Sequence, residues 1–340
     1  MAQATNYNPS QNVKLSVKKE TTVGSHIGAA LNPLQITAFT IPELSVPVEY
    51  SAQRSGSFVT LSDQAHHRQD TKMWTFDTTL RGTPTSILLA TGAVFESASS
   101  AATLAASYSF PTAGYKDTST TTPGTYCFTF DNAGNDGTLD HLRLVGCVGT
   151  GFTLTEDVGS EGGELVVTIN WATAYPPAYN ATDTTGGTTD VGSPRNIRQL
   201  DSANTYINEG SNEEIVVQSW ELAVSRSIER IHYKTTTTQT GFLPFGYAMT
   251  GGFECTGSLT VIRNQDVYDL GVTTKRFLDS NTVNIYLQNS TSSQLIVDIP
   301  KAVLGESTID NGGAVLTQAL PFTVVGNVNQ TSNLLSITIS

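Results

Sequence analysis

The stretch that decides the fold is GGFECTGSLTVIRNQDVYDL, residues 251–270. Its first part predicts a strand, because apolar residues alternate with polar ones from Phe253 to Val261. Gly257 leaves the alternation imperfect, and we expect a β-bulge there. After a turn the apolar spacing changes to three residues, which predicts a short helix that ends at Leu270. A strand followed by so short a helix needs a sheet beside it to cover the helix.

A similar strand and helix are expected much earlier in the chain. Residues 73–80 alternate, a Gly-Thr-Pro turn follows, and residues 85–90 form an apolar segment typical of a short helix. Two further landmarks recur in the same order, namely similar apolar segments at 43–49 and 221–224, and Gly-Gly pairs before a strand at 162–167 and 312–316. We interpret these matches as two copies of one unit. The alternative is that β proteins simply reuse strand–turn–strand patterns.

Composition favours strands and turns over long helices. The 340 residues include 29 glycines, and charged residues make up only 14%. This length is sufficient for two domains with hydrophobic cores. No apolar run approaches the ~20 residues of a membrane span, and the polar N-terminus lacks the layout of a secretion signal. We therefore expect a protein that is made in a cytoplasm and has no membrane partner.

The chain is acidic, with a formal charge of −12 and a pI of about 4.8. This balance argues against gripping nucleic acid, which requires Lys and Arg to neutralise phosphates. It fits a soluble surface, or a wall to which a polyanion does not adhere. The cysteines Cys127, Cys147 and Cys255 are too few and too scattered for a disulfide framework, so buried free thiols are expected.

The predicted fold class is mainly β, with two tandem antiparallel β-sandwich or barrel units that each carry a short flanking helix and are joined by a polar linker. The predicted parts are an N-terminal arm and loop at 1–34, a first β domain at 35–176, a linker at 177–212 and a second β domain at 213–340. Within the first domain, residues 95–125 are rich in Ser, Thr and Ala and are expected to form a surface insertion, with room for a helical turn at 101–106.

Residues that would carry catalysis are not found in a recognisable arrangement. The five histidines have no metal-ligand spacing with Cys, Asp or Glu, and no motif of a nucleophile or a phosphate-binding loop is present. The segment DNAGNDG at 131–137 has oxygen ligands for Ca²⁺ but lacks the bidentate Glu of an EF-hand, so a plain turn is favoured. We expect no enzyme, no cofactor and no metal site.

Long polar loops on small β units, with strands that end at open edges, point instead to self-assembly. Open edges promote aggregation unless a partner covers them, and strand addition between subunits is the productive use of such edges. Identical subunits that contact one another head to tail close into a ring, and stacked rings form a tube. Two segments are expected to project from this body, a hairpin at 48–59 and a Thr-rich loop at 233–246.

With these features, the chain resembles bacteriophage tail tube proteins whose long subunits have two parts. The resemblance rests on the glycine-rich segment, strand and short helix at 247–270, on LIVDIPKA at 295–302, on GGAVLTQALPFTVV at 312–325, on the terminal strand at 334–339 and, in the first half, on 142–171. It covers most of residues 35–175 and 213–340 as a pattern of strands and turns.

The resemblance implies an antiparallel β-sandwich with a flanking helix in each unit. One sheet of each unit would join its neighbours to form a continuous barrel around an axial channel. Six units per ring are usual in that family, so either three chains with two units each or six chains would close a ring. Stacked rings would conduct double-stranded DNA during ejection, without specific binding. The tape-measure protein would fill the channel beforehand, and tail-tip and terminator proteins would be further partners. The protein would be located in the virion tail after assembly in the host cytoplasm.

The two projecting segments supply the predicted site residues. The candidates for ring-to-ring contacts are Tyr50, Arg54, Phe58, Tyr233, Lys234 and Phe242. A rival hypothesis is a phage decoration or receptor-binding module that recognises a surface glycan. Trp74, Trp171 and Trp220 would then stack on sugars, but their places within strand patterns favour core packing.

Overall fold

The computed structural model describes most of both halves of the chain. The described residues are 13–27, 31–34, 36–42, 45, 48–50, 65–67, 72–95, 101–105, 124–131, 141–158, 163–180, 205–207, 213–231, 246–272, 282–289, 295–326 and 333–339. Eighteen of the strands in these ranges belong to one antiparallel sheet, and β4 and β5 form a separate pair. Two helices accompany them. The prediction of a mainly β protein is therefore confirmed.

The elements are named in chain order. The helices are α1 (Pro84–Phe95) and α2 (Gln265–Val272). The strands are β1 (Lys14–Lys19), β2 (Asn32–Pro33), β3 (Ile36–Phe39), β4 (Val48–Tyr50), β5 (Ala65–His67), β6 (Trp74–Arg81), β7 (Ala101–Ala105), β8 (Tyr126–Asp131), β9 (His141–Asp157), β10 (Val166–Thr173), β11 (Ala178–Asn180), β12 (Tyr206–Ile207), β13 (Glu213–Glu214), β14 (Val217–Ile231), β15 (Gly246–Ile262), β16 (Val283–Asn289), β17 (Leu295–Leu304), β18 (Thr308–Asp310), β19 (Thr317–Val324) and β20 (Asn333–Ile339).

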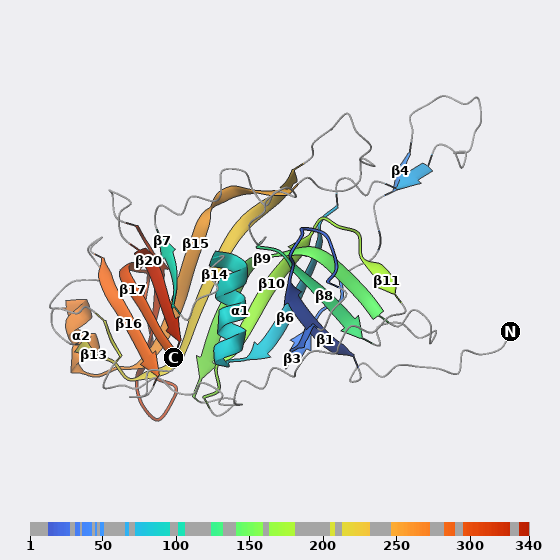
Figure 1. The fold of residues 1–340 in the computed structure, drawn as a ribbon. Helices are drawn as coiled ribbons and strands as arrows, with labels where there is room; N and C mark the ends of the chain where they lie inside the picture. Colours follow the sequence, from blue (N-terminus) through green and yellow to red (C-terminus); the bar gives the residue numbers. More distant parts are fainter. Residues whose placement is uncertain are drawn as a thin grey trace, which may run out of the picture.

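The centre of the sheet runs through both halves of the chain in the order β3–β6–β10–β9–β14–β15–β19. The first four of these strands come from the first half and the last three from the second half (Figure 1). Strand β14 meets β9 with Ser219 opposite Asp157 and Ser225 opposite Gly151. This pairing joins the two halves into one sheet.

The order of pairing in the first half recurs in the second half. The series β3–β6–β10–β9–β8 has its counterpart in β14–β15–β19–β17–β16. The register of the first pair is irregular at the same place in both halves, between Ile36 and Ala38 and between Val217 and Ser219. Strand β9 pairs with β8, β10, β11 and β14, and β17 pairs with β16, β19 and β20. Because each of these strands has different partners along its length, the sheet can fold over its own core.

Each helix follows its strand after the same short turn. The Oγ1 atom of Thr83 accepts a hydrogen bond from the backbone N–H of Ser86, and Oδ1 of Asn264 accepts one from the N–H of Val267. Both residues are therefore N-caps, which satisfy backbone donors that the first helical turn leaves free. Thr83 and Asn264 are separated by as many residues as Ile36 and Val217. The predicted strand-and-helix pairs at 73–90 and 253–270 are confirmed, with longer helices.

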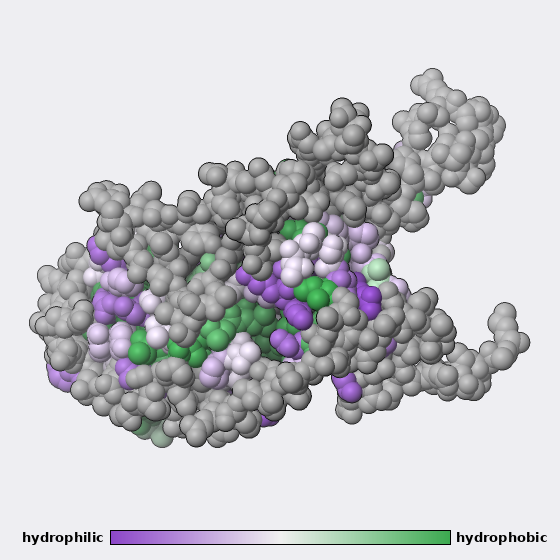
Figure 2. Space-filling model, in the orientation of Figure 1, coloured by the Kyte–Doolittle hydropathy of each residue, from purple (hydrophilic) through white to green (hydrophobic). Residues whose placement is uncertain are grey.

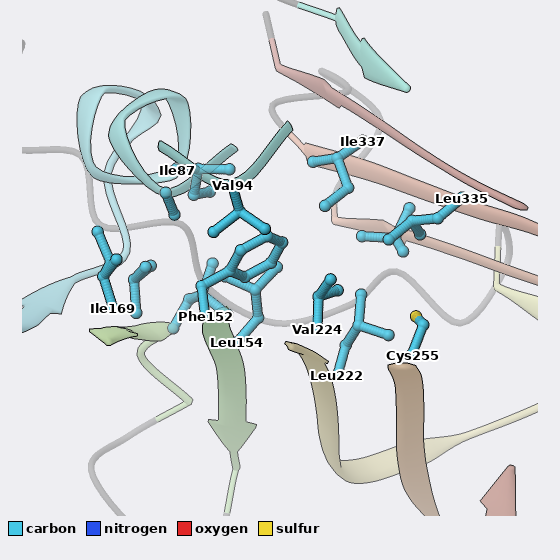
Figure 3. Packing of buried hydrophobic residues seen from close by; sticks show 14 of the residues in the cluster. Ile87, Val94, Phe152, Leu154, Ile169, Leu222, Val224, Cys255, Leu335 and Ile337 are labelled. Atoms are coloured by element: carbon cyan, nitrogen blue, oxygen red, sulfur yellow. The ribbon is translucent and has the colours of Figure 1, made fainter. Parts of the chain in front are cut away.

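Apolar side chains on one face of the central sheet form a core that continues across the junction of the halves. Helix α1 covers β9 and β10, so that Ile87 and Val94 lie over Phe152 (Figures 1 and 3). On the other side of the junction, Leu335 and Ile337 of β20 face the residues of β14 and β15 (Figure 3). On the face seen in Figure 2, hydrophobic residues are visible near the centre, between hydrophilic ones on both sides.

Aromatic rings fill the core of the first half where the sheet folds over. Phe76 of β6 meets Phe128 of β8 edge to face, with ring centroids 5.1 Å apart, and Phe128 meets Trp171 at 4.8 Å. Such perpendicular contacts bring the positive edge of one ring to the negative face of another. The Nε1 atom of Trp171 donates to Oγ1 of Thr78, so the buried indole leaves no donor unsatisfied.

Strands are also present in the expected arm, linker and insertion. Residues 14–33, assigned to the arm and loop, contain β1 and β2, and Leu15 and Val17 of β1 are buried against the core. The linker at 177–212 has β11 and β12 near its ends, which pair with β9 and β16. In the expected insertion, the helical turn at 101–106 is wrong, because Ala101–Ala105 is a strand that pairs with β20. Main-chain bonding to β20 overrides the helical preference of alanine there.

The β-bulge expected at Gly257 is also wrong. Gly257 pairs in regular register with Leu222 on one side and Phe322 on the other. It is the inward-facing member of an unbroken alternation in which Cys255 and Leu259 are buried. A Cβ at this position would lie 2.3 Å from the ring of Phe322 and 2.4 Å from a backbone oxygen. The glycine is therefore required by packing.

Replacement of Gly257 by alanine tests this explanation. We expect Gly257→Ala to reduce the free energy of unfolding by about 1–3 kcal/mol, because the new methyl group overpacks the core. The measurement is chemical denaturation of the purified protein. Gly252→Ala on the same strand is the matched control, because a Cβ there meets nothing within 4 Å. Equal stability of the two variants would contradict the packing role.

Candidate functional site

The face of the central sheet opposite the core is covered by hydroxyl-bearing and acidic side chains. Strand register places one row of small residues side by side across both halves, namely Thr79, Thr168, Thr153, Ala223, Thr256 and Thr323. These residues alternate with buried ones along each strand, so they point away from the core. The result is a broad polar surface that spans the junction.

Acidic side chains outnumber basic ones on this open face. Among the described residues of the central strands, the charged groups that point this way include the carboxylates of Asp77, Asp157, Glu221 and Glu254 and the guanidinium of Arg81. Carboxylates on one surface give it a negative potential, which repels polyanions. Hydroxyl groups beside them hydrogen-bond to water and offer no cation to a phosphate.

A cavity of about 370 Å³ opens at the junction of the halves, at the end where β9 meets the start of β14. It is lined by Thr155, Glu156, Asp157, Glu164, Val166, Ser219, Trp220, Glu221 and Ser258. The carboxylate of Glu156 is buried and accepts a 2.6 Å hydrogen bond from Nε1 of Trp220. This bond ties the first half to the second. Within the described residues, no three His, Cys, Asp or Glu side chains are grouped so that they could hold a metal ion.

A buried arginine fastens α1 to the second half. Nε of Arg226, on β14, donates to the carbonyl of Gly149 at 2.9 Å, and its Nη2 donates to the carbonyl of Ala93 at 3.1 Å. Ala93 lies in the last turn of α1, where carbonyl groups lack helical partners and a cation is favourable. Sequence reasoning missed Arg226, although a basic residue among the alternating apolar residues of a strand is a signal for a buried polar contact.

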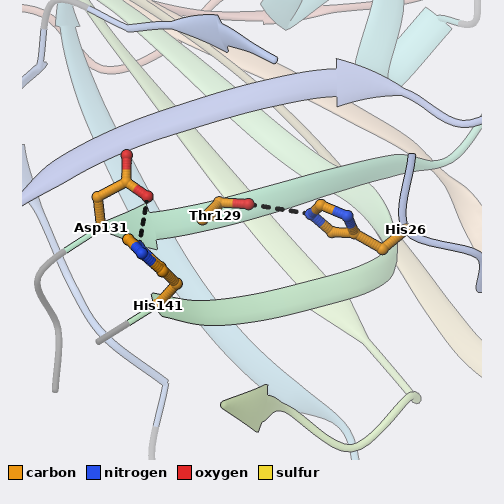
Figure 4. Close-up of polar contacts among 4 residues, drawn as sticks. All are labelled: His26, Thr129, Asp131 and His141. Atoms are coloured by element: carbon orange, nitrogen blue, oxygen red, sulfur yellow. Dashed lines mark hydrogen bonds and ion pairs between the residues drawn. The ribbon is translucent and has the colours of Figure 1, made fainter. Parts of the chain in front are cut away.

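Two histidines on the outer part of the first half are held by polar partners (Figure 4). His141 Nδ1 lies 2.9 Å from Oδ1 of Asp131, and His26 Nε2 lies 2.9 Å from Oγ1 of Thr129. Asp131 ends β8, and the following residues of the DNAGNDG segment lie outside the described ranges. Burial, and secondarily the positive charge of Arg143, lowers the pKa of His26 to about 4.

Of the six candidates for ring-to-ring contacts, the structure describes one. Tyr50 lies on β4 and is 63% exposed. Its strand pairs with β5, so that Val48 lies opposite His67. The rest of the hairpin expected at 48–59 lies outside the described residues. Figure 1 shows β4 projecting far from the body of the sheet. The others, Arg54, Phe58, Tyr233, Lys234 and Phe242, lie outside the described residues.

The tryptophans considered for glycan stacking are core residues. Trp74, Trp171 and Trp220 are all buried, each at 3% exposure or less, as their strand positions predicted. The three cysteines are buried free thiols, also as expected.

Comparison of the chain with protein-family models and with curated proteins gave no match. Among the residues that the structure describes, no helix has both the length and the apolar character to span a membrane.

The contact of His26 predicts an acid-dependent loss of stability. A histidine whose pKa is lowered in the folded state contributes stability that is present above pH 6.5 and is lost as the pH falls towards about 4. We expect acidification over this range to lower the free energy of unfolding more in the wild-type protein than in His26→Gln. Denaturant titrations at both ends of the range measure the difference. The same loss in both proteins would show that His26 does not contribute.

Proposed function

We propose that this chain is a virion structural protein that polymerises into stacked rings and forms the tube of a phage tail, whose channel conducts double-stranded DNA during ejection. The observation that supports this proposal best is the pairing of β9 with β14. It joins two halves with the same order of strand pairing. Two units within one chain thus already lie side by side as neighbours in a ring would.

The same observation favours three chains per ring. We interpret the recurring pairing order, the shared irregularity and the two N-capped helices as two tandem units of one kind, each a β-sandwich with a flanking helix. If every junction in the ring repeats the junction of β9 with β14, each chain supplies two of the six positions that are usual in tail tubes. Three chains then close a ring with pseudo-sixfold symmetry.

The two ends of the central sheet carry exposed apolar residues that match each other. At the junction within the chain, Leu154 of β9 lies opposite Leu222 of β14, and both are fully buried. The counterpart of Leu154 is Ile309 on β18. Leu154 is aligned through β10 with a residue of β6, and Ile309 is aligned through β19 with the equivalent residue of β15. The counterpart of Leu222 is Ile41 beyond β3, by the same spacing that relates Ile36 to Val217.

Ile309 is 51% exposed and Ile41 is 45% exposed. Large aliphatic side chains at an open strand edge are a liability unless another strand covers them. We infer that Ile309 of one chain packs against Ile41 of the next, as Leu154 packs against Leu222 within the chain. Strand addition at these edges would continue the sheet around the ring.

In such a ring the polar face that carries Glu221 and Glu254 would line the channel. The opposite face is excluded from this role, because α1 and the folded-over strands cover it. A negative, hydroxyl-rich lining repels DNA and lets it slide, whereas a basic lining would hold it by counterion release. The tape-measure protein and the tail-tip and terminator proteins would be the other partners, and the projecting segment at β4 would contact the next ring.

A cross-linking experiment tests the contact between chains. The double variant Ile41→Cys/Ile309→Cys is treated with a short thiol-specific cross-linker at a protein concentration at which negative-stain electron microscopy shows rings. Directly opposite residues of an antiparallel pair have Cβ atoms about 5 Å apart, so we expect covalent dimers and trimers that end at three chains. The native cysteines are buried and should not react.

Each outcome of this experiment is informative. Ile309→Cys alone and Ile309→Cys combined with Tyr179→Cys, an exposed position on β11, are the matched controls and should stay monomeric on a denaturing gel. A ladder that continues to six chains would contradict the three-chain ring. Rings without cross-links would contradict the proposed edges. Small particles without rings would favour the rival decoration or receptor-binding module.

Reversal of charge on the open face tests the channel assignment. We expect assembled Glu221→Lys/Glu254→Lys protein to bind short double-stranded DNA at low salt, with affinity that falls steeply as salt is added. The wild-type assembly and the matched variant Glu221→Gln/Glu254→Gln should not bind, because neutral amides attract no phosphate. Fluorescence anisotropy of labelled DNA measures the difference. Equal lack of binding by all three would place these side chains outside the channel.

A further inference from the structure

The turn after β18 holds the one Asn-Gly dipeptide of the chain, Asn311–Gly312. Asn311 follows directly on the last pair of β18, in which Asp310 lies opposite Thr317. Every residue from 308 to 316 is exposed. The side-chain amide of Asn311 and the backbone of Gly312 are therefore open to water.

An exposed asparagine before a glycine is a chemically reactive pair. The backbone nitrogen of the glycine can attack Cγ of the asparagine side chain and close a five-membered ring. Glycine favours this step because it has no Cβ to obstruct the approach or to restrict the backbone. The turn leaves room for it. Among the described residues, a Cβ at Gly313 would have its nearest neighbour at 3.6 Å, and one at Gly312 would approach only Oδ1 of Asp310, at 3.2 Å.

A carboxylate already contacts the nitrogen that would attack. The backbone N–H of Gly312 donates a 2.8 Å hydrogen bond to Oδ1 of Asp310. Aspartate often makes this bond to the backbone two residues on, where it stabilises a turn. The same distance also lies within the range over which a general base accepts a proton. The proton that must leave Gly312 before its nitrogen forms a new bond thus already points at an acceptor.

We propose that Asn311–Gly312 is a self-modifying site at which Asp310 acts as the base. The nitrogen of Gly312 forms a bond to Cγ of Asn311 while Asp310 accepts its proton. That proton passes to Nδ2 of Asn311, which leaves as ammonia when its bond to Cγ breaks, so a cyclic succinimide remains and Asp310 is regenerated. Water then opens the ring at either carbonyl and gives aspartate or isoaspartate. The sum is one water consumed and one ammonia released, with no change of oxidation state.

The modification alters the turn that holds β18 against β19. Both products carry a carboxylate in place of a neutral amide, which adds a negative charge next to Asp310. In the isoaspartate product the main chain also runs through the former side chain, so the backbone gains one methylene directly after the pair of Asp310 and Thr317. Both changes lie within two residues of Ile309, the exposed aliphatic side chain of this strand.

Other asparagines of the chain lack these features. On β16, Nδ2 of Asn284 donates to Oδ1 of Asp298 and to the carbonyl of Ile299, so its amide is held, and a β-branched isoleucine follows it. On β10, Nδ2 of Asn170 donates to Oδ1 of Asp77. We expect neither residue to react, and Asn284 is the internal control.

Ageing of the purified protein at neutral pH tests the site. Peptide mass spectrometry with fragmentation should show a mass gain of about 1 Da at Asn311 that grows with time, because a hydroxyl replaces an amino group. Asn284 should keep its mass. In a parallel incubation in heavy-oxygen water, the new carboxylate should carry the heavy isotope, which separates reaction of the folded protein from reaction during digestion.

Three variants assign the roles. Gly312→Ala supplies the missing Cβ and should slow the reaction about tenfold or more. Asp310→Ser keeps an acceptor for the turn but no carboxylate. It should slow the reaction about tenfold, less than a buried general base contributes, because Asp310 is exposed to water. Glu306→Gln removes another exposed carboxylate near β18 and should keep the wild-type rate.

The same measurements can overturn the proposal. An unchanged mass at Asn311 would exclude the site, and equal gains at Asn311 and Asn284 would show unselective ageing of the chain. Equal rates in the wild-type protein and Asp310→Ser would exclude the role of Asp310 as the base. The comparison of Asn311 with Asn284 is made in the wild-type protein, so it does not depend on the folding of any variant. The inference does not depend on the proposed function.

Discussion

The pairing of β9 with β14 is the constraint on which the rest of the structure depends. The 17 residues of β9 belong to two layers. Its first part pairs with β8 and β11 in the folded-over layer, and its last part is a central strand between β10 and β14. If β14 slipped by one residue against β9, Leu222 would turn to the open face and Glu221 into the core, while Leu154 kept its buried position beside β10. One register thus fixes both the core and the polar surface.

Buried polar groups gather where the halves meet, and they make this register specific. Glu156 reaches the indole of Trp220, Arg226 reaches the carbonyls of Gly149 and Ala93, and Tyr247 reaches the backbone beside Gly146. Burial of each of these groups costs desolvation free energy, which the hydrogen bonds in this arrangement of the halves offset. Apolar packing supplies the driving force for joining the halves, while these contacts exclude other alignments.

Local patterns in the sequence located the elements but not their partners. Alternation identified the strands that contain Trp74 and Cys255, and the helices after them, since these signals lie within a few residues. Gly257 was misread as a bulge because the reason for a glycine there is the ring of Phe322, which is distant in sequence. Ala101–Ala105 was misread because its partner β20 ends the chain. The sequence could predict that Glu221 and Glu254 point away from the core, since they alternate with apolar neighbours. It could not predict the strand pairing that brings both side chains to one surface.

The position of Arg226 also bears on how an assembly of this protein would respond to force. By the spacing that relates Ile36 to Val217 and Thr83 to Asn264, its counterpart in the first half is Ser45, which is exposed and has no guanidinium to offer a neighbouring helix. In the proposed ring, the three junctions within chains would therefore hold a clamp that the three junctions between chains lack. Rupture under tension would begin between chains, and it would release intact two-unit subunits instead of tearing them.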